Sequence, residues 1–540
     1  MVSEEGLERL VKRTGLECMW ENDMDDETKK TLIVAGSALE LLIVLHNHVV
    51  QSVSLAFPDS AEMVNKHAAT AGEILLDNLR TAPGQLKLTK RLDKFAANFE
   101  RLAVLDKLSI NPGLNLYEGV AGIYESLARL HQWELQKARE DPTLAGKGDE
   151  YLQNIVRCVK SGEPGMNLRG RVCLSVDFWR EKHLLPPSTK QMSDYAAETE
   201  KSWALLISCT HLRDLTTSPV RISDKWIAPE IEKMPGLLGW EEPPNTLLPA
   251  PESEKEGDAL ATDSALLGPR LPEVSFLAAF DPPLQIDGGV WQTLQQMGIG
   301  MSTLDPNPQT YDSLLFPVPA GTQYIASEPR VLSRHKKVEF RPRGETQWSL
   351  KHHSNTLYVY KPSWGKTLSE VTFSHPRLLV NMLPSLRQFA FLSTLLQNSF
   401  GEKPDPPEPP AASGPTTTSD QTTTSRDEFA AFMAEANGSA PSHNLAELGS
   451  KELPLQVDVT LNVHPIPRLQ IVFPFRSGTA SVDLEIQENG RVHVESQNIL
   501  DASNTIGANG RQRSAEDLGK LLETFEDIGK WCEFIRTRWA

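Results

Sequence analysis

The N-terminal part of the chain has a period of two in its apolar positions. Around Glu40 these positions are Leu39, Leu41, Ile43 and Leu45. A second apolar segment, residues 49–57, follows a polar break that contains His46 and His48. Because successive side chains of a strand point to opposite faces, this pattern predicts a β-hairpin or meander.

Intervals of three and four residues between apolar positions then predict two amphipathic helices. These positions are Leu88, Leu92, Phe95, Phe99 and Leu102 within residues 85–108, and Leu116, Val120, Ile123, Leu127 and Leu130 in the second helix. Asn115 is expected to cap the second helix, since Glu118 follows three residues later as in a capping box. Strands are predicted at residues 172–179 and 203–209.

In the middle of the chain, short apolar runs predict strands near residues 275–286, 337–341 and 357–360. A helix is predicted after Pro384, because proline suits a first helical turn, where its missing N–H has no partner to lose.

The C-terminal part gives the clearest strand pattern, with apolar residues at Leu455, Val457, Val459, Leu461 and Val463. Polar residues alternate with them, which predicts a strand with one solvated face. Further on, a two-residue loop at Asn489 and Gly490 would set the apolar residues of its two strands on opposite faces. A three-residue loop, residues 488–490, pairs Ile486 with Val492 and Leu484 with Val494. This second register is predicted, with Gly490 at positive φ.

A final helix is expected to begin near Ser514. It has Glu516 and Asp517 in its first turn and Arg536 and Arg538 in its last, the charge order that the helix dipole favours. Its apolar positions form a seam of Leu518, Leu521, Phe525, Ile528, Cys532, Ile535 and Trp539. Packing of this seam on the chain's own sheet is favoured, and packing on a partner helix is the alternative.

Two proline-rich stretches, residues 241–272 and 401–453, interrupt these elements. They are expected to be disordered linkers, because their composition buries too little apolar surface to offset the entropy of ordering. The predicted regions are an α+β region at 1–145, a β-rich region at 146–240, an α+β region at 273–400, and hairpins with a terminal helix at 454–540. The expected fold class is therefore α+β and multi-domain, with mixed β-sheets, amphipathic helices and a C-terminal helix.

The 540-residue chain carries a net charge of −17, which argues against nucleic-acid binding, because neutralising phosphates requires clustered Lys and Arg. The densest basic run, residues 334–337, favours a solvated strand end over a targeting or phosphate-binding patch. Five cysteines without a CxxC pair fit a reducing compartment. Neither a secretory signal nor a membrane span is expected, since the most apolar stretch, residues 31–50, is interrupted by Glu40 and other polar residues.

No catalytic, cofactor or metal site is predicted. The sequence contains no phosphate-binding loop, GxSxG elbow or HExxH motif. Gly298 and Gly300 lack the third glycine of a dinucleotide fingerprint. The pairs His46/His48 and His352/His353 have no Cys or carboxylate at ligand spacing and are interpreted as turn or strand residues. An enzyme of unfamiliar type remains the alternative.

Two LxxLL patterns, residues 392–396 and 518–522, could dock as amphipathic helices in an apolar groove of a partner. Both fall inside longer predicted helices, so we interpret them as core.

Several runs together resemble the family of subunit 1 of the Mediator complex of RNA polymerase II transcription, in its fungal form. The runs are residues 31–36, 99–103, 105–109, 117–118, 122–127, 174–179, 375–377, 383–388 and 526–529, with Trp531 and residues 535–538. Each run is weak alone, but their order and number make the resemblance specific. Cys173 and Phe178 replace a Gly and a Tyr common in the family, which we interpret as drift within a strand.

The resemblance implies a nuclear, non-enzymatic coactivator subunit of Mediator's middle module that bridges gene-specific activators and RNA polymerase II. Expected partners are neighbouring subunits such as subunits 4 and 9, the polymerase machinery and activators, with no direct nucleic acid and no membrane. Receptor-binding LxxLL motifs of a long metazoan tail are not carried over to this sequence. A scaffold subunit of another assembly is the alternative function.

Overall fold

The structure of the chain is a computed structural model. It describes residues 2–23, 26, 28–80, 90–111, 113–185, 201–212, 218–249, 269–301, 309–319, 321, 325–340, 349–402, 454–500 and 512–539. Most of the two predicted linkers, residues 250–268 and 403–453, lies outside the described residues.

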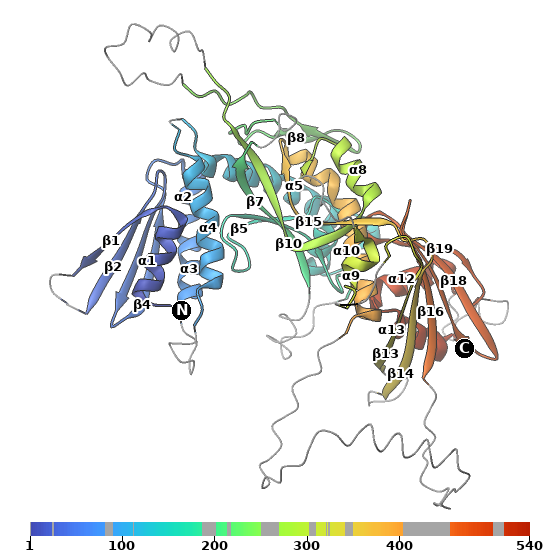
Figure 1. The fold of residues 1–540 in the computed structure, drawn as a ribbon. Coiled ribbons are helices and arrows are strands. Elements are labelled where there is room, and N and C mark those ends of the chain that lie inside the picture. The colour runs from blue at the N-terminus through green and yellow to red at the C-terminus, as the bar shows by residue number, and fades with distance from the viewer. Residues whose placement is uncertain are drawn as a thin grey trace, which may run out of the picture.

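The N-terminal part is a four-stranded antiparallel sheet with helices on one side (Figure 1). Its elements are α1 (Glu4–Thr14), β1 (Glu17–Asn22), β2 (Lys29–Ala35), β3 (Glu40–His46), β4 (Val49–Ala56), α2 (Glu62–Asn65), α3 (Ala68–Leu79) and α4 (Asp93–Leu108). The predicted hairpin is confirmed as β3 and β4, with Leu41 and Leu45 buried beneath the helices. Phe95, Phe99 and Leu102 of the predicted helical stripe are buried as well, whereas Leu88 lies outside the described residues.

One buried carboxylate attaches the β2–β3 connection to α4. Asp106 accepts hydrogen bonds from the backbone N–H groups of Ser37, Ala38 and Leu39, at 2.8, 2.8 and 3.2 Å. The carboxylate lies so close to Gly36 that a Cβ there would be 2.4 Å from Asp106 Oδ2. Position 36, just before these three amides, must therefore be glycine. The amides, which the sheet leaves unpaired, gain a charged acceptor.

The next part joins long helices to a seven-stranded sheet with the order β11-β15-β10-β7-β6-β5, in which β12 also pairs with β15. Its helices are α5 (Leu116–Glu140), α6 (Asp149–Val159), α8 (Gly288–Gln296) and α9 (Tyr311–Leu315), with a 3₁₀ turn at η2 (Pro142–Leu144). Its strands are β5 (Glu163–Met166), β6 (Leu174–Arg180), β7 (Ser202–His211), β10 (Val274–Asp287), β11 (Gly300–Met301), β12 (Gln309–Thr310) and β15 (Trp364–Phe373), and β8 (Ile227–Met234) with β9 (Leu237–Trp240) forms a separate hairpin.

The predicted cap of α5 is confirmed, because the Asn115 side chain accepts from the N–H groups of Tyr117 and Glu118. The second half of the capping box differs from the prediction: Glu118 accepts from Ala61 N instead and so holds the start of α2. Cys173 was predicted inside a strand, which is wrong. It precedes β6 with φ of 73°, a left-handed conformation that glycine adopts without strain.

The seven-stranded sheet draws its strands from both sides of residues 250–268, since β7 pairs with β10 over eight residues. Inside the predicted disordered linker, residues 241–272, the structure has an antiparallel bridge between Leu248 and Arg270, so the ends of this stretch are ordered. Leu248 is buried there. The sequence regions on the two sides of the linker therefore share one hydrophobic core.

The last part is a six-stranded mixed sheet in the order β13-β14-β16-β17-β18-β19. Its elements are β13 (Arg330–Phe340), β14 (Ser349–Val359), β16 (Leu455–Asn462), β17 (Arg468–Phe475), β18 (Gly478–Ile486), the 3₁₀ turn η4 (Glu488–Gly490), β19 (Val492–Gln497), α12 (Ala515–Phe525) and α13 (Ile528–Arg538). The predicted register is confirmed, with Ile486 opposite Val492 and Leu484 opposite Val494. Positive φ occurs at Gly490 and also at Asn489. The α+β class with mixed sheets is confirmed.

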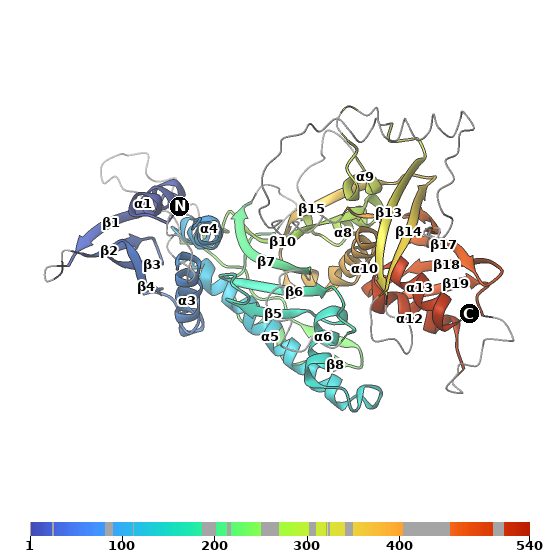
Figure 2. The same ribbon diagram turned by 90° about the horizontal axis from the view of Figure 1, so that it is seen from below.

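A long helix, α10 (Pro376–Phe400), packs between the two large sheets (Figure 2). The prediction that this helix starts after Pro384 is wrong, because Pro376 occupies the first turn and His375 is the N-cap. Pro384 lies in the interior of α10, and the sequence pattern did not show that the helix begins two turns before it.

The single terminal helix predicted from the seam is also corrected. The helix breaks at Glu526, whose φ is 50°, and Asp527 caps a second helix. The Ser514 cap is confirmed, as a reciprocal capping box with Asp517. The seam residues Leu518, Ile528, Cys532 and Ile535 are fully buried against the chain's own β-sheet, so the favoured packing is confirmed.

Arg387 of α10 links the C-terminal end of α6 to β6 and to the turn η4. Its guanidinium donates to the carbonyls of Phe178, Arg157 and Lys160 and to Asn489 Oδ1. Its side chain is completely buried, and burial lowers the pKa of Arg387 to about 10, which leaves it charged at neutral pH.

Replacing Arg387 by Met should lower the free energy of unfolding by about 3 kcal/mol or more, because several buried oxygens lose their donor. The midpoint of urea unfolding measures this loss. Arg377→Met is the matched control, since Arg377 lies on the same helix with its side chain 46% exposed. Equal midpoints for the two variants would contradict the structural role of Arg387.

Candidate interaction site

The histidine pairs singled out in the sequence do not form metal sites. His46 and His48 lie at the β3–β4 turn, where His46 contacts Asp26 and His48 contacts Glu4. His352 is exposed, while His353 is buried and its Nε2 lies 2.9 Å from Glu533 Oε1. Among the described residues, no group of three or more His, Cys, Asp or Glu side chains is placed to hold a metal ion.

The His353–Glu533 contact joins β14 to α13. Burial raises the pKa of Glu533, but the hydrogen bond with His353 and the charge of Arg536 outweigh burial, and the net pKa is lowered. The pair thus holds α13 against β14 of the six-stranded sheet.

Both LxxLL patterns are part of the core. Leu392, Leu395 and Leu396 of α10 are completely buried, and so are Leu518 and Leu522 of α12. Leu521, the remaining leucine of the second pattern, is half-buried. The five fully buried leucines cannot reach a groove on a partner unless the fold opens, which supports the interpretation as core.

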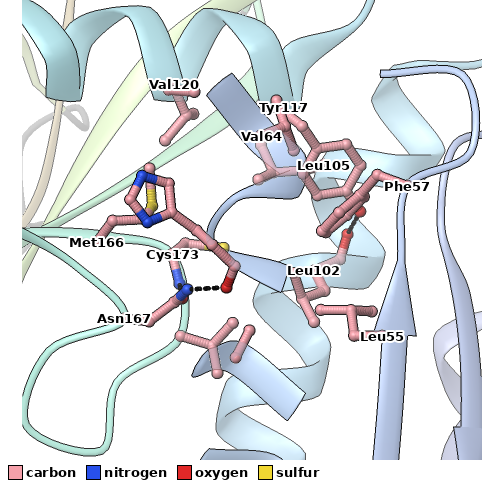
Figure 3. Close-up of a pocket in the computed structure, with 14 residues that line it drawn as sticks. Leu55, Phe57, Val64, Leu102, Leu105, Tyr117, Val120, Met166, Asn167 and Cys173 are labelled. Atoms are coloured by element: carbon pink, nitrogen blue, oxygen red, sulfur yellow. Dashed lines mark hydrogen bonds between the residues drawn. The ribbon is translucent and has the colours of Figure 1, made fainter. Parts of the chain in front are cut away.

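A small cavity of about 40 Å³ lies between the N-terminal helices and the loop before β6 (Figure 3). Leucine, valine and aromatic side chains form most of its wall, including Leu55, Phe57 and Val120. Asn167 closes one side by donating to the carbonyl of His67 at 2.8 Å and accepting from Cys173 N at 2.9 Å. Ligand pockets generally measure several hundred Å³, so this cavity is much smaller than a typical ligand site.

The open face of the N-terminal sheet carries a row of apolar side chains. Met19, Ile33 and Leu42 lie side by side on β1, β2 and β3, with Val44 next to them on the face opposite the buried Leu41 and Ile43. Met19 is 64% exposed. In Figure 1, α1, α3 and α4 lie on the other side of the sheet, and no described element covers this one. We call these four residues the apolar face.

Three glutamates, Glu17, Glu21 and Glu40, share this side of the sheet with the apolar face. No described residue forms a hydrogen bond or ion pair with their carboxylates. The site is therefore apolar in the middle and negatively charged at its margin, which suits recognition of another protein.

The sequence analysis did not find this site. A signal was present, because residues 41–45 are Leu-Leu-Ile-Val-Leu, apolar at both parities of the strand. Such continuous apolar runs are typical of strands covered on both faces.

Filling the cavity should stabilise the fold. Val120→Ile adds one methyl group at the cavity wall and should raise the free energy of unfolding by up to about 0.8 kcal/mol. Val156→Ile is the control, because Val156 is fully buried but lines no part of the cavity, so the added methyl should destabilise. Chemical denaturation of both variants checks the sign, and a destabilised Val120→Ile protein would refute the cavity's geometry.

The cap of α10 should make stability depend on pH. The ring of His375 accepts from Arg377 N through Nδ1 and donates to the Glu241 carbonyl through Nε2, and burial lowers its pKa. Because the folded pKa is below the unfolded value of about 6.5, the neutral ring's contribution is present above pH 6.5 and is lost as the pH falls.

His375→Asn retains a capping side chain but cannot titrate in this range. The thermal midpoint of the wild type should exceed that of the variant at pH 7.5, and the difference should shrink by pH 5.5. A constant or growing difference would show that His375 contributes no such pH dependence.

Within the part of the chain that the structure describes, no helix is long and apolar enough to cross a membrane. A family model described as Mediator of RNA polymerase II transcription subunit 1 matches residues 1–401. No curated protein matches the sequence.

Proposed function

The chain belongs to the family of Mediator subunit 1, a family of transcription regulators within the Mediator complex, and from this premise we propose that it is a non-catalytic subunit of the middle module that bridges gene-specific activators and RNA polymerase II.

The observation that carries the proposal is the extent of the family match. Residues 1–401 include the N-terminal sheet with its apolar face, the seven-stranded sheet, and the strands β13 and β14 of the six-stranded sheet. The match ends at the C-terminus of α10, directly after the helix that packs between both large sheets.

The character of the buried ionisable groups supports a non-catalytic role. Asp106 binds backbone amides, Arg387 binds carbonyls and a side-chain amide, and Glu533 pairs with His353. Each of these groups is used up in holding elements together, so none is free to transfer a proton or attack a substrate. The family is generally non-catalytic as well.

We further propose that the chain acts in the nucleus, where members of the family generally occur, and that subunits 4 and 9 are among its neighbours. The apolar face, on which Met19 is exposed and Ile33, Leu42 and Val44 are half-buried, supports a function through protein contacts. An apolar surface with an acidic margin is typical of an interaction surface.

Affinity purification tests the proposal. An epitope-tagged full-length chain, expressed at its natural level, should co-purify with other Mediator subunits, including subunits 4 and 9, in stoichiometric amounts by mass spectrometry. The same tag on an unrelated nuclear protein is the control. Recovery of the tagged chain as a monomer, or with a different assembly, would overturn the proposed function.

A further inference from the structure

The two sheets that expose a face to solvent differ in the residues they present. On β16, β17 and β18 of the six-stranded sheet, the open face carries Asp458, Thr460, Gln470 and Asp483. The open face of the N-terminal sheet carries Met19, Ile33, Leu42 and Val44 at corresponding positions of its strands. The open face of β16, β17 and β18 is therefore mostly polar, with Val472 as an exception, and Val331 on β13 adds an exposed apolar residue to the same face. The middle of the apolar face has no charged residue.

The apolar face has the size and shape for a helix. Four strands about 4.8 Å apart present a surface roughly 14 Å wide, and an α-helix with its side chains is about 10 Å across. Uncharged residues, among them Thr31, Ser52 and Ser54, continue this surface across the strands. No charged side chain interrupts it between Met19 and Val44.

Charge decides between the possible occupants. Glu17 and Glu40 lie at one end of the apolar face, and Glu21 lies beside Met19 toward the other end. A second copy of the chain would bring these carboxylates against one another, and an anionic membrane surface would repel them. Toward the opposite end, Lys29 is already paired with Asp23, at 2.7 Å. A partner with Lys or Arg at its margins satisfies both the apolar middle and the acidic ends.

We propose that the apolar face binds an amphipathic helix of another Mediator subunit, with an apolar stripe flanked by Lys and Arg. The proposal rests on the proposed function in that it places the partner within Mediator. Apolar side chains at i, i+3, i+4 and i+7 of the bound helix would cover Met19, Ile33, Leu42 and Val44, and its basic residues would pair with Glu17, Glu21 and Glu40.

A photo-reactive amino acid at position 19 tests which protein covers the face. Tagged chain with benzoylphenylalanine in place of Met19 is purified with its complex, irradiated and digested, and the crosslinked peptide is sequenced by mass spectrometry. The same amino acid in place of Gln470, which is exposed on the polar face of β17, is the control.

The expected product at position 19 is a peptide of another Mediator subunit with helical apolar spacing and flanking Lys or Arg, and position 470 should not give it. A crosslink to a second copy, to another segment of this chain or to an acidic peptide would overturn the proposal. So would a complex that is recovered intact without any crosslink at position 19. If the tagged wild type recovers no Mediator subunit at all, the proposed function itself fails.

Charge reversal supplies a second measurement. Glu17→Lys with Glu21→Lys should reduce recovery of the crosslinked subunit by about tenfold or more at physiological salt, because two attractive contacts become repulsive. Glu328→Lys with Glu339→Lys makes the same change of charge at exposed positions near β13 and should leave recovery unchanged.

Both pairs are exposed, so the thermal transition of the isolated chain should be unaffected. Met19→Glu, at a position that is 64% exposed, repeats the test through the apolar contact alone. Unchanged recovery of the crosslinked subunit with both Met19→Glu and the double Lys variant would overturn the proposal.

Discussion

The fold depends on the guanidinium of Arg387, which donates to four oxygens that have no partner within regular secondary structure. Arg157 and Lys160 lie at the C-terminal end of α6, where carbonyls have no helical partner, and Phe178 lies at a bulge between β6 and β7. Asn489 sits in the left-handed turn before β19. Arg387 binds all four, so a helix end, a strand irregularity and a turn some 330 residues apart in sequence become one junction. An unpaired acceptor at any of them would be costly, which ties these elements together.

Around that junction the chain uses nearly all its amphipathic surfaces internally. The helix α10 is buried between two sheets, and the terminal helices α12 and α13 pack beside it on the same face of the six-stranded sheet. Most leucines of both LxxLL patterns are buried in this packing. The four-stranded sheet is different, because the face opposite its helices is apolar in the middle (Figure 1). A subunit of a large assembly needs a surface whose burial favours association, and the open face of this sheet provides one.

Several buried charged groups in the described structure join separate parts of the fold. Asp106 holds a strand connection, Asp177 pairs with Arg169 and Arg171, and His353 with Glu533 attaches the last helix to the sheet. In each case a charged group replaces hydrogen bonds that irregular backbone or an element junction cannot supply. Such contacts make the junctions between these elements rigid.

The sequence determined what depends on neighbours along the chain. Period-two patterns located β3, β4, β16 and the β18–β19 register, and cap residues located the starts of α5 and α12. Local patterns could not show where α10 begins or that Glu526 breaks the terminal helix, since packing of distant elements fixes those points. Only the tertiary structure decided that Arg387 gathers acceptors from three elements, that the LxxLL leucines are covered, and that the apolar run of β3 has a cover on one side alone. Burial is set by which surfaces meet in space, and a sequence pattern records only that a surface is apolar.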